Sequence, residues 1–333
     1  MNGTQLTELE QRIRTDYSNI AGMVVRKDGK TVYDGCFGGC TPDNRIHVFS
    51  VTKSVLSILF GIALDKGFLD SIDRRVLDFY PEYTCKRGEK TIQQITIRDM
   101  LTMTAPYKYK STPYTKYFTS PDWVKFSLDL LGGKGSIGVF RYAPLIGPDI
   151  LSGILVKATG RSVLDFAQEN LFAPLGIPIA QSVTFHSKEE QMAFYKATGM
   201  SVWVADPQGV NAGGWGLTLS AADLANIGQL LLNGGVRNGT QIVSENWILE
   251  STCAQSRWLE CNLPYGYLWW VLEEEHGFAA MGDGGNIIYV NRRSNLVVAI
   301  TSRFQPRVTD RIELIRKYVA PVFAGNGIDI AEA

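Results

Sequence analysis

The feature that most constrains this chain is a long apolar run, VTKSVLSILFGIALD, at residues 51–65. Apolar residues stand at 51, 55, 58, 59 and 62, and also at 56, 60, 63 and 64, which is more than one face of a helix. A helix of that composition is buried on most sides. The run is far too short to span a bilayer, so we expect the helix in the centre of a folded core.

A serine and a lysine stand three residues apart where this helix begins. One helical turn separates Ser50 from Lys53, so both side chains project from the same face. A neutral serine needs a base to take its proton, and a buried lysine can be that base because burial disfavours the charged amine. The N–H groups at a helix N-terminus also suit an oxyanion. The alternative is that Ser50 only caps the helix and Lys53 is solvated.

Composition excludes several classes of protein. The chain has 333 residues, enough for roughly two domains, with 45% hydrophobic and 20% charged residues, as in ordinary globular proteins. Lysine plus arginine equals aspartate plus glutamate at 33 each, which argues against nucleic acid or an anionic membrane as partner. No signal sequence is evident, and five cysteines favour reduced thiols in a cytoplasmic protein. Cys36 and Cys40 lack CxxC spacing, so we expect no redox pair.

Both ends of the chain have strand patterns, and the middle has helix patterns. Two β-rich runs flank the hairpin turn KDGK at residues 27–30, and four more lie near the C-terminus before a final amphipathic segment. Between them, Thr96, Ser162 and Ser220 each precede an aspartate by three residues, as in capping boxes. We therefore predict an α/β multidomain architecture with an antiparallel sheet. Residues 1–52 and 208–333 form one discontinuous domain, residues 53–207 form a mostly helical domain, and the active site lies at their junction.

The stretch HVFSVTKSVLSILFGIALDKGFLDSIDRRVLDFYPEY resembles the serine β-lactamase and penicillin-binding protein superfamily, in particular its class C branch. ITIRDMLTMTAP, GGWGLTLSAADLANIGQLLLNGG and YGYLWW are similar to later segments of that branch, in the same order. The resemblance implies the β-lactamase/transpeptidase-like fold, with Ser50 as nucleophile and Lys53 as base. It also covers family VIII esterases and hydrolases that open 6-aminohexanoate oligomers.

The second motif of the family, Y-x-N, matches FRYAPLIGPDILSGILVKATG. The resemblance makes Tyr142 a partner of Lys53 in proton transfer, and a nearby ammonium is expected to lower the pKa of the phenol. The alternative is an ordinary buried tyrosine. Pro144 stands where the family has asparagine, and it has no side-chain amide to hold a substrate amide group.

The third motif, K-T-G or H-x-G, aligns on Gly282 in FAAMGDGGNIIYV. Ala280 and Met281 then replace the polar pair that contacts a substrate carboxylate. The resemblance places the backbone N–H groups of Ser50 and Asp283 in an oxyanion hole. Gly282 and Gly284 would allow a substrate to approach the backbone closely, although a β-bulge would explain these glycines too.

Aromatic residues are expected to line the cleft. Tyr107 lies in a loop rich in tyrosine and proline, and Trp215 lies in GGWG, so both are candidate substrate contacts, with core packing as the alternative. His47, His186 and His276 show no metal-binding spacing, and no G-x-S-x-G surrounds Ser50, so we expect neither a metal site nor a Ser-His-Asp triad. No cofactor is implied.

These observations predict a serine hydrolase that acts on a small ester or amide through an acyl-enzyme on Ser50. The altered second and third motifs make a true β-lactamase less suitable than an esterase or amidase. Two alternatives stay open. One is a degenerate member of the fold that binds a ligand without turning it over, and the other is a module that senses β-lactams or peptides.

Overall fold

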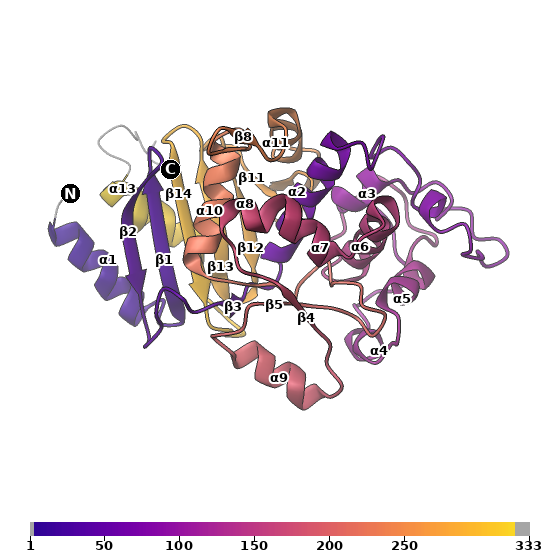
Figure 1. Ribbon diagram of the computed structural model, residues 1–333, viewed down its shortest axis with the longest axis horizontal. Coiled ribbons are helices and arrows are strands. Elements are labelled where there is room, and N and C mark those ends of the chain that lie inside the picture. The colour runs from indigo at the N-terminus through magenta and orange to yellow at the C-terminus, as the bar shows by residue number, and fades with distance from the viewer. Residues whose placement is uncertain (1–2, 324–333) are drawn as a thin grey trace.

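The computed structural model describes residues 3–323, and its centre is one large antiparallel sheet of eight strands (Figure 1). The strand order is β2-β1-β14-β13-β12-β11-β10-β9, so the first strand of the chain pairs directly with the last, and β2 pairs with β1 at the edge. The bounds of these strands are β1 Ile20–Lys27, β2 Lys30–Cys36, β9 Ser256–Trp258, β10 Leu263–Tyr265, β11 Trp270–Leu272, β12 Gly277–Gly282, β13 Asn286–Asn291 and β14 Leu296–Ser302.

The central strands are buried on both faces, and their side chains alternate between two hydrophobic clusters. On β13, Ile287 and Tyr289 join one cluster, whereas Ile288 and Val290 join the other. The first face is covered by terminal helices, α1 Gly3–Thr15, α12 Arg311–Leu314, η4 Ile315–Val319 and α13 Ala320–Phe323. The second is covered by α10 Ala221–Leu232 and by the apolar helix α2 Val51–Asp65. The expected amphipathic C-terminal segment therefore does pack on the sheet.

The region on the right of Figure 1 is mostly helical and lies against α2. Its helices are η1 Val76–Phe79, α3 Ile97–Leu101, α4 Tyr114–Phe118, α5 Trp123–Leu130, α6 Ile146–Thr159, α7 Val163–Ala167, η2 Gln168–Phe172, α8 Ala173–Leu175 and α9 Lys188–Lys196. Short strand pairs connect it to the sheet region, namely β3 Ile46–His47 with β6 Thr218–Leu219 and β4 Gln181–Val183 with β5 Val202–Val204. The hairpin β7 Val236–Arg237 and β8 Thr240–Gln241 precedes α11 Glu245–Ser251.

Local sequence signals fix several ends of these elements. The β1–β2 turn has positive φ at Asp28 and Gly29, 51° and 75°, the geometry that Asp-Gly favours in a two-residue hairpin. Thr96 and Ser220 form complete capping boxes at α3 and α10. Ser162 accepts from Asp165 N at the start of α7 and donates from its hydroxyl to the Asp165 carboxylate.

The predicted fold class is confirmed: an antiparallel sheet flanked by terminal helices, with a mostly helical region inserted in the chain. The domain boundaries at residues 52/53 and 207/208 remain a prediction. No helix within residues 3–323 is both long and apolar enough to cross a membrane.

Candidate active site

Ser50 lies on a sharp turn between strand β3 and helix α2. Phe49, directly before it, has φ of 49°, a left-handed conformation that costs a bulky residue roughly 1–2 kcal/mol. Thr52 stabilises this turn, since its N–H and its hydroxyl both donate to the Phe49 carbonyl, at 3.1 and 2.7 Å. On the N-terminal side of Phe49, Val48 N donates to Leu217 O at 3.0 Å. These bonds hold Ser50 at the first turn of α2.

Ser50 and Lys53 are in direct contact. Lys53 Nζ lies 2.8 Å from Ser50 Oγ and 2.9 Å from the Gly214 carbonyl oxygen. Lys53 is only 1% exposed, while Ser50 is partly accessible. Ser50 occupies the N-cap position, but its hydroxyl makes no capping hydrogen bond. This geometry excludes the alternative of a helix cap beside a solvated lysine.

Burial makes Lys53 suitable as a base. It lowers the pKa of the amine from 10.5 to about 7, and the negative charges of Asp283 and Asp149 oppose that shift. Near neutral pH a substantial share of Lys53 is therefore uncharged. A neutral amine can donate one N–H to Gly214 O and still offer its lone pair to the Ser50 hydroxyl.

Tyr142 also lies beside Ser50 and Lys53. Its hydroxyl is hydrogen-bonded to Ser50, and its ring centroid is 5.2 Å from Lys53 Nζ and 5.7 Å from the stacked Trp270 ring on β11. Burial raises the pKa of Tyr142 to about 12, which outweighs the opposite effect of the Ser50 hydrogen bond. The expected lowering of this pKa is wrong, because burial and the negative charge of Asp283 both disfavour the phenolate. Tyr142 is thus a proton donor at neutral pH.

Gly282, at the end of β12, brings the sheet against the backbone of Val48 and Ser50. A Cβ at this position would lie 2.1 Å from Val48 O and 3.2 Å from Ser50 N. Only glycine fits this approach, and the space it leaves is beside the Ser50 N–H. Within residues 3–323, neither Ser50 N–H nor the Asp283 N–H that follows Gly282 has an acceptor. Two free donors on adjoining segments are what an oxyanion hole requires.

The turn after Gly282 is rigidly held. Gly284 and Gly285 have φ of 79° and 87°, a conformation that other residues rarely adopt, and they reverse the chain into β13. Asn286 Nδ2 donates to Asp283 O, and Asn19 Nδ2 donates to Gly284 O, both at 2.8 Å. The Asp283 backbone is therefore fixed, whereas its carboxylate is exposed.

The sequence did not single out Asp149, a buried carboxylate on α6. Its side chain accepts from Gly213 N at 2.9 Å and from the Tyr117 hydroxyl at 2.5 Å, and Trp215 Nε1 donates to the same hydroxyl at 3.3 Å. Burial raises the pKa of Asp149 to about 7, against the effect of these bonds. Asp149 thus fixes the segment whose next carbonyl, Gly214 O, accepts from Lys53.

The two glycines of this segment allow it to pack tightly on the N-terminal end of α6. A Cβ on Gly213 would lie 2.1 Å from Pro148 O, and one on Gly214 would lie 2.3 Å from Pro144 O. Pro144, which stands where the family has asparagine, therefore supports the segment that contacts Lys53. A signal for Asp149 was present in the sequence: it is a lone acid in the apolar run YAPLIGPDILSGILV, seven residues after Tyr142.

The structure places the two aromatic candidates differently. Tyr107 lies in the helical core, where its ring is 5.5 Å from Tyr109 and its hydroxyl abuts Gly147 on α6. Trp215 directly follows Gly214, but its ring is buried among other aromatic rings, including Trp123 at 5.8 Å. The geometry brings Trp215 next to the site through its backbone and leaves Tyr107 outside the group around Ser50. Their roles in substrate binding remain predictions.

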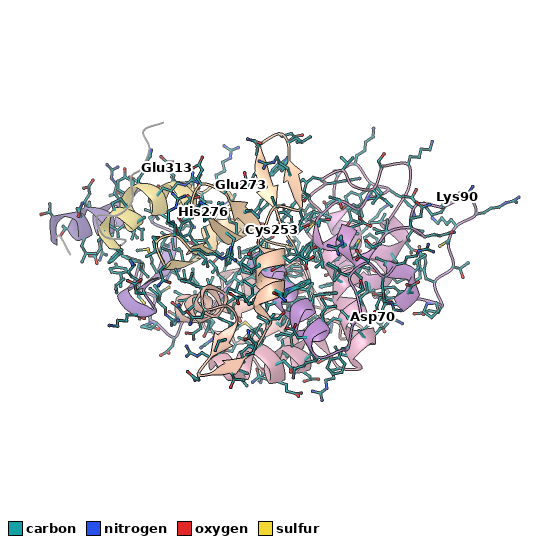
Figure 2. All side chains as sticks on the ribbon, turned by 90° about the horizontal axis from the view of Figure 1, so that it is seen from above. Asp70, Lys90, Cys253, Glu273, His276 and Glu313 are labelled. Carbon is teal, nitrogen blue, oxygen red and sulfur yellow. The ribbon has the colours of Figure 1, made fainter. Side chains whose placement is uncertain are left out.

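The histidines and cysteines lie outside the nucleophile group. His47 is buried, accepts from Gly216 N at 2.9 Å, and has a pKa lowered by burial to about 3. His276 donates its backbone N–H to Glu273 O at 3.2 Å, and Figure 2 labels both residues well apart from Asp70 in the helical region. All five cysteines, which fall within residues 3–323, are free thiols, and no group of three potential metal ligands occurs in the same range.

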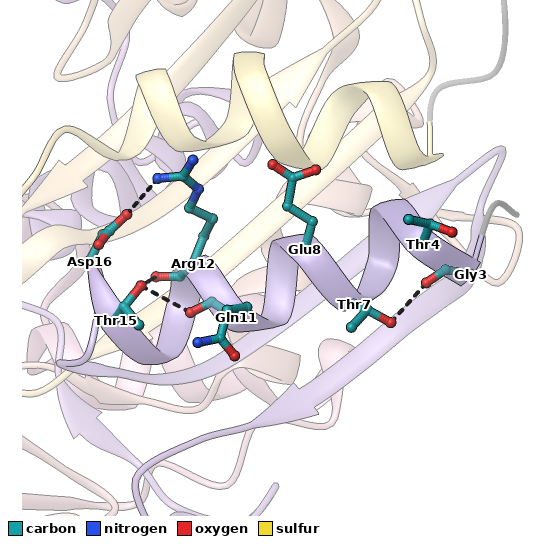
Figure 3. A pocket seen from close by; sticks show the side chains of 8 residues that line it. All are labelled: Gly3, Thr4, Thr7, Glu8, Gln11, Arg12, Thr15 and Asp16. Atoms are coloured by element: carbon teal, nitrogen blue, oxygen red, sulfur yellow. Dashed lines mark hydrogen bonds and ion pairs between the residues drawn. The ribbon is translucent and has the colours of Figure 1, made fainter.

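A surface hollow runs along helix α1 (Figure 3). Its polar side chains bond along their own helix: Thr7 to Gly3 O at 2.9 Å, and Arg12 to Asp16 at 3.0 Å. An exposed ion pair one helical turn apart adds little binding energy. This hollow brings together no nucleophile and base, in contrast to the group at Ser50.

Comparisons with known proteins agree with this arrangement. The family model described as Beta-lactamase matches residues 9–320. A 6-aminohexanoate-dimer hydrolase of Paenarthrobacter ureafaciens is 23% identical over 320 residues, covering 89% of this chain and 75% of the relative. Among solved structures, a putative 6-aminohexanoate-dimer hydrolase from Bacillus anthracis has a TM-score of 0.72 at 18% identity, covering 95% of this chain and 81% of that one. A family VIII carboxylesterase has a TM-score of 0.70 at 17% identity, covering 95% and 96%. With its fold and nearly all of its length matched, the chain belongs to the Beta-lactamase family.

Proposed function

We propose that this protein is a serine hydrolase that cleaves a small ester or amide through an acyl-enzyme on Ser50. The observation that carries the proposal is the 2.8 Å contact between Ser50 Oγ and a buried amine, Lys53 Nζ. The pKa of that amine, lowered by burial to about 7, supports its use as a base near neutral pH.

Acylation follows from this geometry. The lone pair of Lys53 takes the Ser50 hydroxyl proton while Oγ attacks the substrate carbonyl carbon. The carbonyl oxygen becomes an oxyanion that accepts from the N–H groups of Ser50 and Asp283. As the tetrahedral intermediate collapses, the bond to the leaving group breaks and that group takes the Tyr142 proton. The Lys53 ammonium then returns a proton to Tyr142.

Deacylation reverses these roles. A water molecule gives a proton to the Lys53–Tyr142 pair and attacks the acyl carbon, using the same two N–H donors. The bond to Ser50 Oγ breaks, Oγ regains a proton, and the carboxylic acid leaves. The Gly214 carbonyl keeps the lysine amine oriented through both steps.

The replaced motif residues favour esters and simple amides over β-lactams. Ala280 is fully buried on β12, and neither it nor Met281 can donate a side-chain hydrogen bond to a substrate carboxylate. Pro144 offers no amide for an acylamino group. The relatives named as a 6-aminohexanoate-dimer hydrolase and a family VIII carboxylesterase support the same preference. The cytoplasmic location expected from the sequence stays a prediction.

The proposal is tested with Ser50→Ala and p-nitrophenyl butyrate. We expect the wild-type protein to release p-nitrophenol and the variant to lose at least about a thousandfold in kcat/KM. A serine-directed fluorophosphonate should add one adduct to the wild-type mass and none to the variant. Undiminished turnover by Ser50→Ala would refute the assignment of the nucleophile.

The replacements at Pro144, Ala280 and Met281 also support a second candidate, a member of the fold that binds ligands without turnover. That candidate predicts folded protein whose Ser50 is not labelled by the fluorophosphonate. A β-lactam-sensing module predicts a stable penicilloyl adduct in the same mass measurement. The lowered pKa of Lys53 has no evident use in a binding protein, and for that reason we prefer the hydrolase.

A further inference from the structure

The carboxylate of Asp283 is the most unusual charge at this site. Its residue supplies one of the two N–H groups of the proposed oxyanion hole, and its backbone is fixed by Asn286 and Asn19. The side chain is exposed, and within residues 3–323 it forms neither an ion pair nor a hydrogen bond. An exposed acid held at a fixed place beside Ser50 without a partner is available to a ligand.

Side chains from four other segments lie within electrostatic range of this carboxylate. Its charge acts on Lys53 of α2, on Tyr142, on Tyr114 of α4 and on Tyr195 of α9. The negative charge of Asp283 adds to the effect of burial in raising the pKa of Tyr114. The same two causes raise the pKa of Tyr195 to about 12. The sheet thus presents the carboxylate, and the helical region presents tyrosines toward it.

Aromatic residues also lie beside this site, since Phe49 precedes Ser50 and a Cβ on Gly284 would lie 3.3 Å from Phe304 Cα. Tyr114 is 52% exposed and Phe304 is 43% exposed, and the ring of Tyr195 lies 6.3 Å from Phe304 and 5.5 Å from Phe49. Ring faces attract cations, most strongly where water is partly excluded. A carboxylate beside exposed aromatic rings is a combination that favours an ammonium group.

The proposed reaction would proceed more easily with a positively charged group beside the Asp283 carboxylate. During acylation and deacylation, negative charge develops on an oxygen held by the Asp283 N–H, and the Asp283 carboxylate on the same residue opposes that charge. A neutral substrate leaves this repulsion in place, and an anionic one increases it. A substrate ammonium next to Asp283 cancels it.

Resting on the proposed hydrolase function, we infer that the site around Ser50 is selective for esters or amides whose acyl part carries a positively charged amine, and that Asp283 is the residue that selects it. The acyl part is favoured over the leaving group because it remains on Ser50 during both steps. Its charge therefore offsets the repulsion from Asp283 in both transition states, whereas a charged leaving group acts only in the first.

The test uses three p-nitrophenyl esters that share a hexanoyl chain and end in trimethylammonium, tert-butyl or carboxylate. The quaternary amine cannot attack its own ester. Rates are measured at a pH where Lys53 is largely neutral, and each variant is compared by its ratio of kcat/KM for charged and tert-butyl esters. Asp283→Asn keeps the backbone N–H and removes the charge. Asp70→Asn, an exposed acid of the helical region, is the matched control (Figure 2).

We expect the wild-type protein to prefer the cationic ester over the neutral one and the neutral one over the anionic. Asp283→Asn should reduce the cationic-to-neutral ratio by at least about fivefold, the effect of one charge near 4 Å in a water-like medium. It should also raise the anionic-to-neutral ratio, and added salt should weaken the wild-type preference. Asp70→Asn should change neither ratio.

Wild-type protein without a preference for the cation, or an Asp283→Asn variant with unchanged ratios, overturns the inference while the hydrolase function stands. Absence of turnover with all three esters overturns the proposed function, and the inference with it.

Discussion

Asp149 gives the sharpest test of how this site sets the protonation of its base. Replacing it with asparagine removes a negative charge that raises the pKa of Lys53 and leaves the shape of the side chain unchanged. Asparagine Oδ1 can still accept from Gly213 N–H, and its amide can donate to the Tyr117 oxygen. Asp149→Asn therefore changes charge and largely keeps the Gly213–Gly214 segment in place.

The size of the change in the Lys53 pKa follows from the separation between Lys53 and Asp149. Lys53 Nζ contacts Gly214 O at 2.9 Å, and the Asp149 carboxylate contacts Gly213 N at 2.9 Å. These contacts set the charge separation at roughly 10 Å, which at an effective dielectric constant of about 20 gives roughly 1.7 kcal/mol, or about one pH unit. Because the pKa of Asp149 is itself raised to about 7, its charge is complete only above that pH. The shift is therefore at most about one unit.

The direction of the change in the pH–rate profile follows from the role of Lys53 as the base. Lys53 must be neutral to take the Ser50 proton, so kcat/KM should rise with pH through the pKa of Lys53, near 7. Without the Asp149 charge, the ammonium is less stabilised and its pKa falls. We expect the acid limb of kcat/KM for a neutral p-nitrophenyl ester to move to lower pH in Asp149→Asn.

Asp149→Ala is the control for position rather than charge. It leaves Gly213 N–H and the Tyr117 hydroxyl without their acceptor, at a cost of roughly 1–3 kcal/mol each. This variant should unfold at a markedly lower temperature and lose activity at every pH. An acid limb that stays in place or moves to higher pH in Asp149→Asn would refute the electrostatic coupling.

Two further predictions concern the partners of Ser50. Tyr142→Phe should keep the ring stacked on Trp270, so the unfolding temperature should not change. Initial rates on the neutral ester should fall roughly 10²- to 10⁴-fold, because the proposed proton donor is gone. Rates near those of the wild-type protein would contradict this role of Tyr142. Lys53→Met should change how stability depends on pH. The pKa of Lys53 is about 7 in the folded protein and near 10.5 in the unfolded protein, so the unfolded wild-type protein binds more protons between these pH values. The free energy of unfolding of the wild-type protein, measured by chemical denaturation, should therefore rise by a few kcal/mol from pH 7 to 10 relative to that of the variant. The same dependence of this free energy on pH in both proteins would contradict the prediction.

The sequence predicted the scaffold of the site because the relevant signals are local. The apolar run of α2 indicated a buried helix, and Lys53 is accordingly 1% exposed. The hairpin turn at Asp28–Gly29 and the capping boxes at Thr96 and Ser220 depend on residues a few positions apart, and the structure has all of them. Fold class followed from the order of these elements.

What the sequence missed depends on contacts between segments far apart in the chain. Asp149 reaches Gly213, 64 residues away, and nothing in either segment alone indicates the pairing. Pro144 was expected only to lack an amide, yet its carbonyl packs at the glycine that positions Lys53. The pKa of Tyr142 was expected to fall because an ammonium was assumed nearby. The degree of desolvation, which sets this pKa, depends on the whole pocket.

One desolvated pocket sets the protonation of all three groups near Ser50. Burial lowers the pKa of Lys53 to about 7 and raises those of Tyr142 and Asp149, so each uncharged form is favoured together with the others. Asp283, in contrast, presents an exposed carboxylate that has no hydrogen bond or ion pair within residues 3–323. Ala280 and Met281 supply no counter-charge at the position where the family binds a substrate carboxylate. The features that support Ser50 as the proposed nucleophile therefore also support the proposed preference for a cationic over an anionic acyl group.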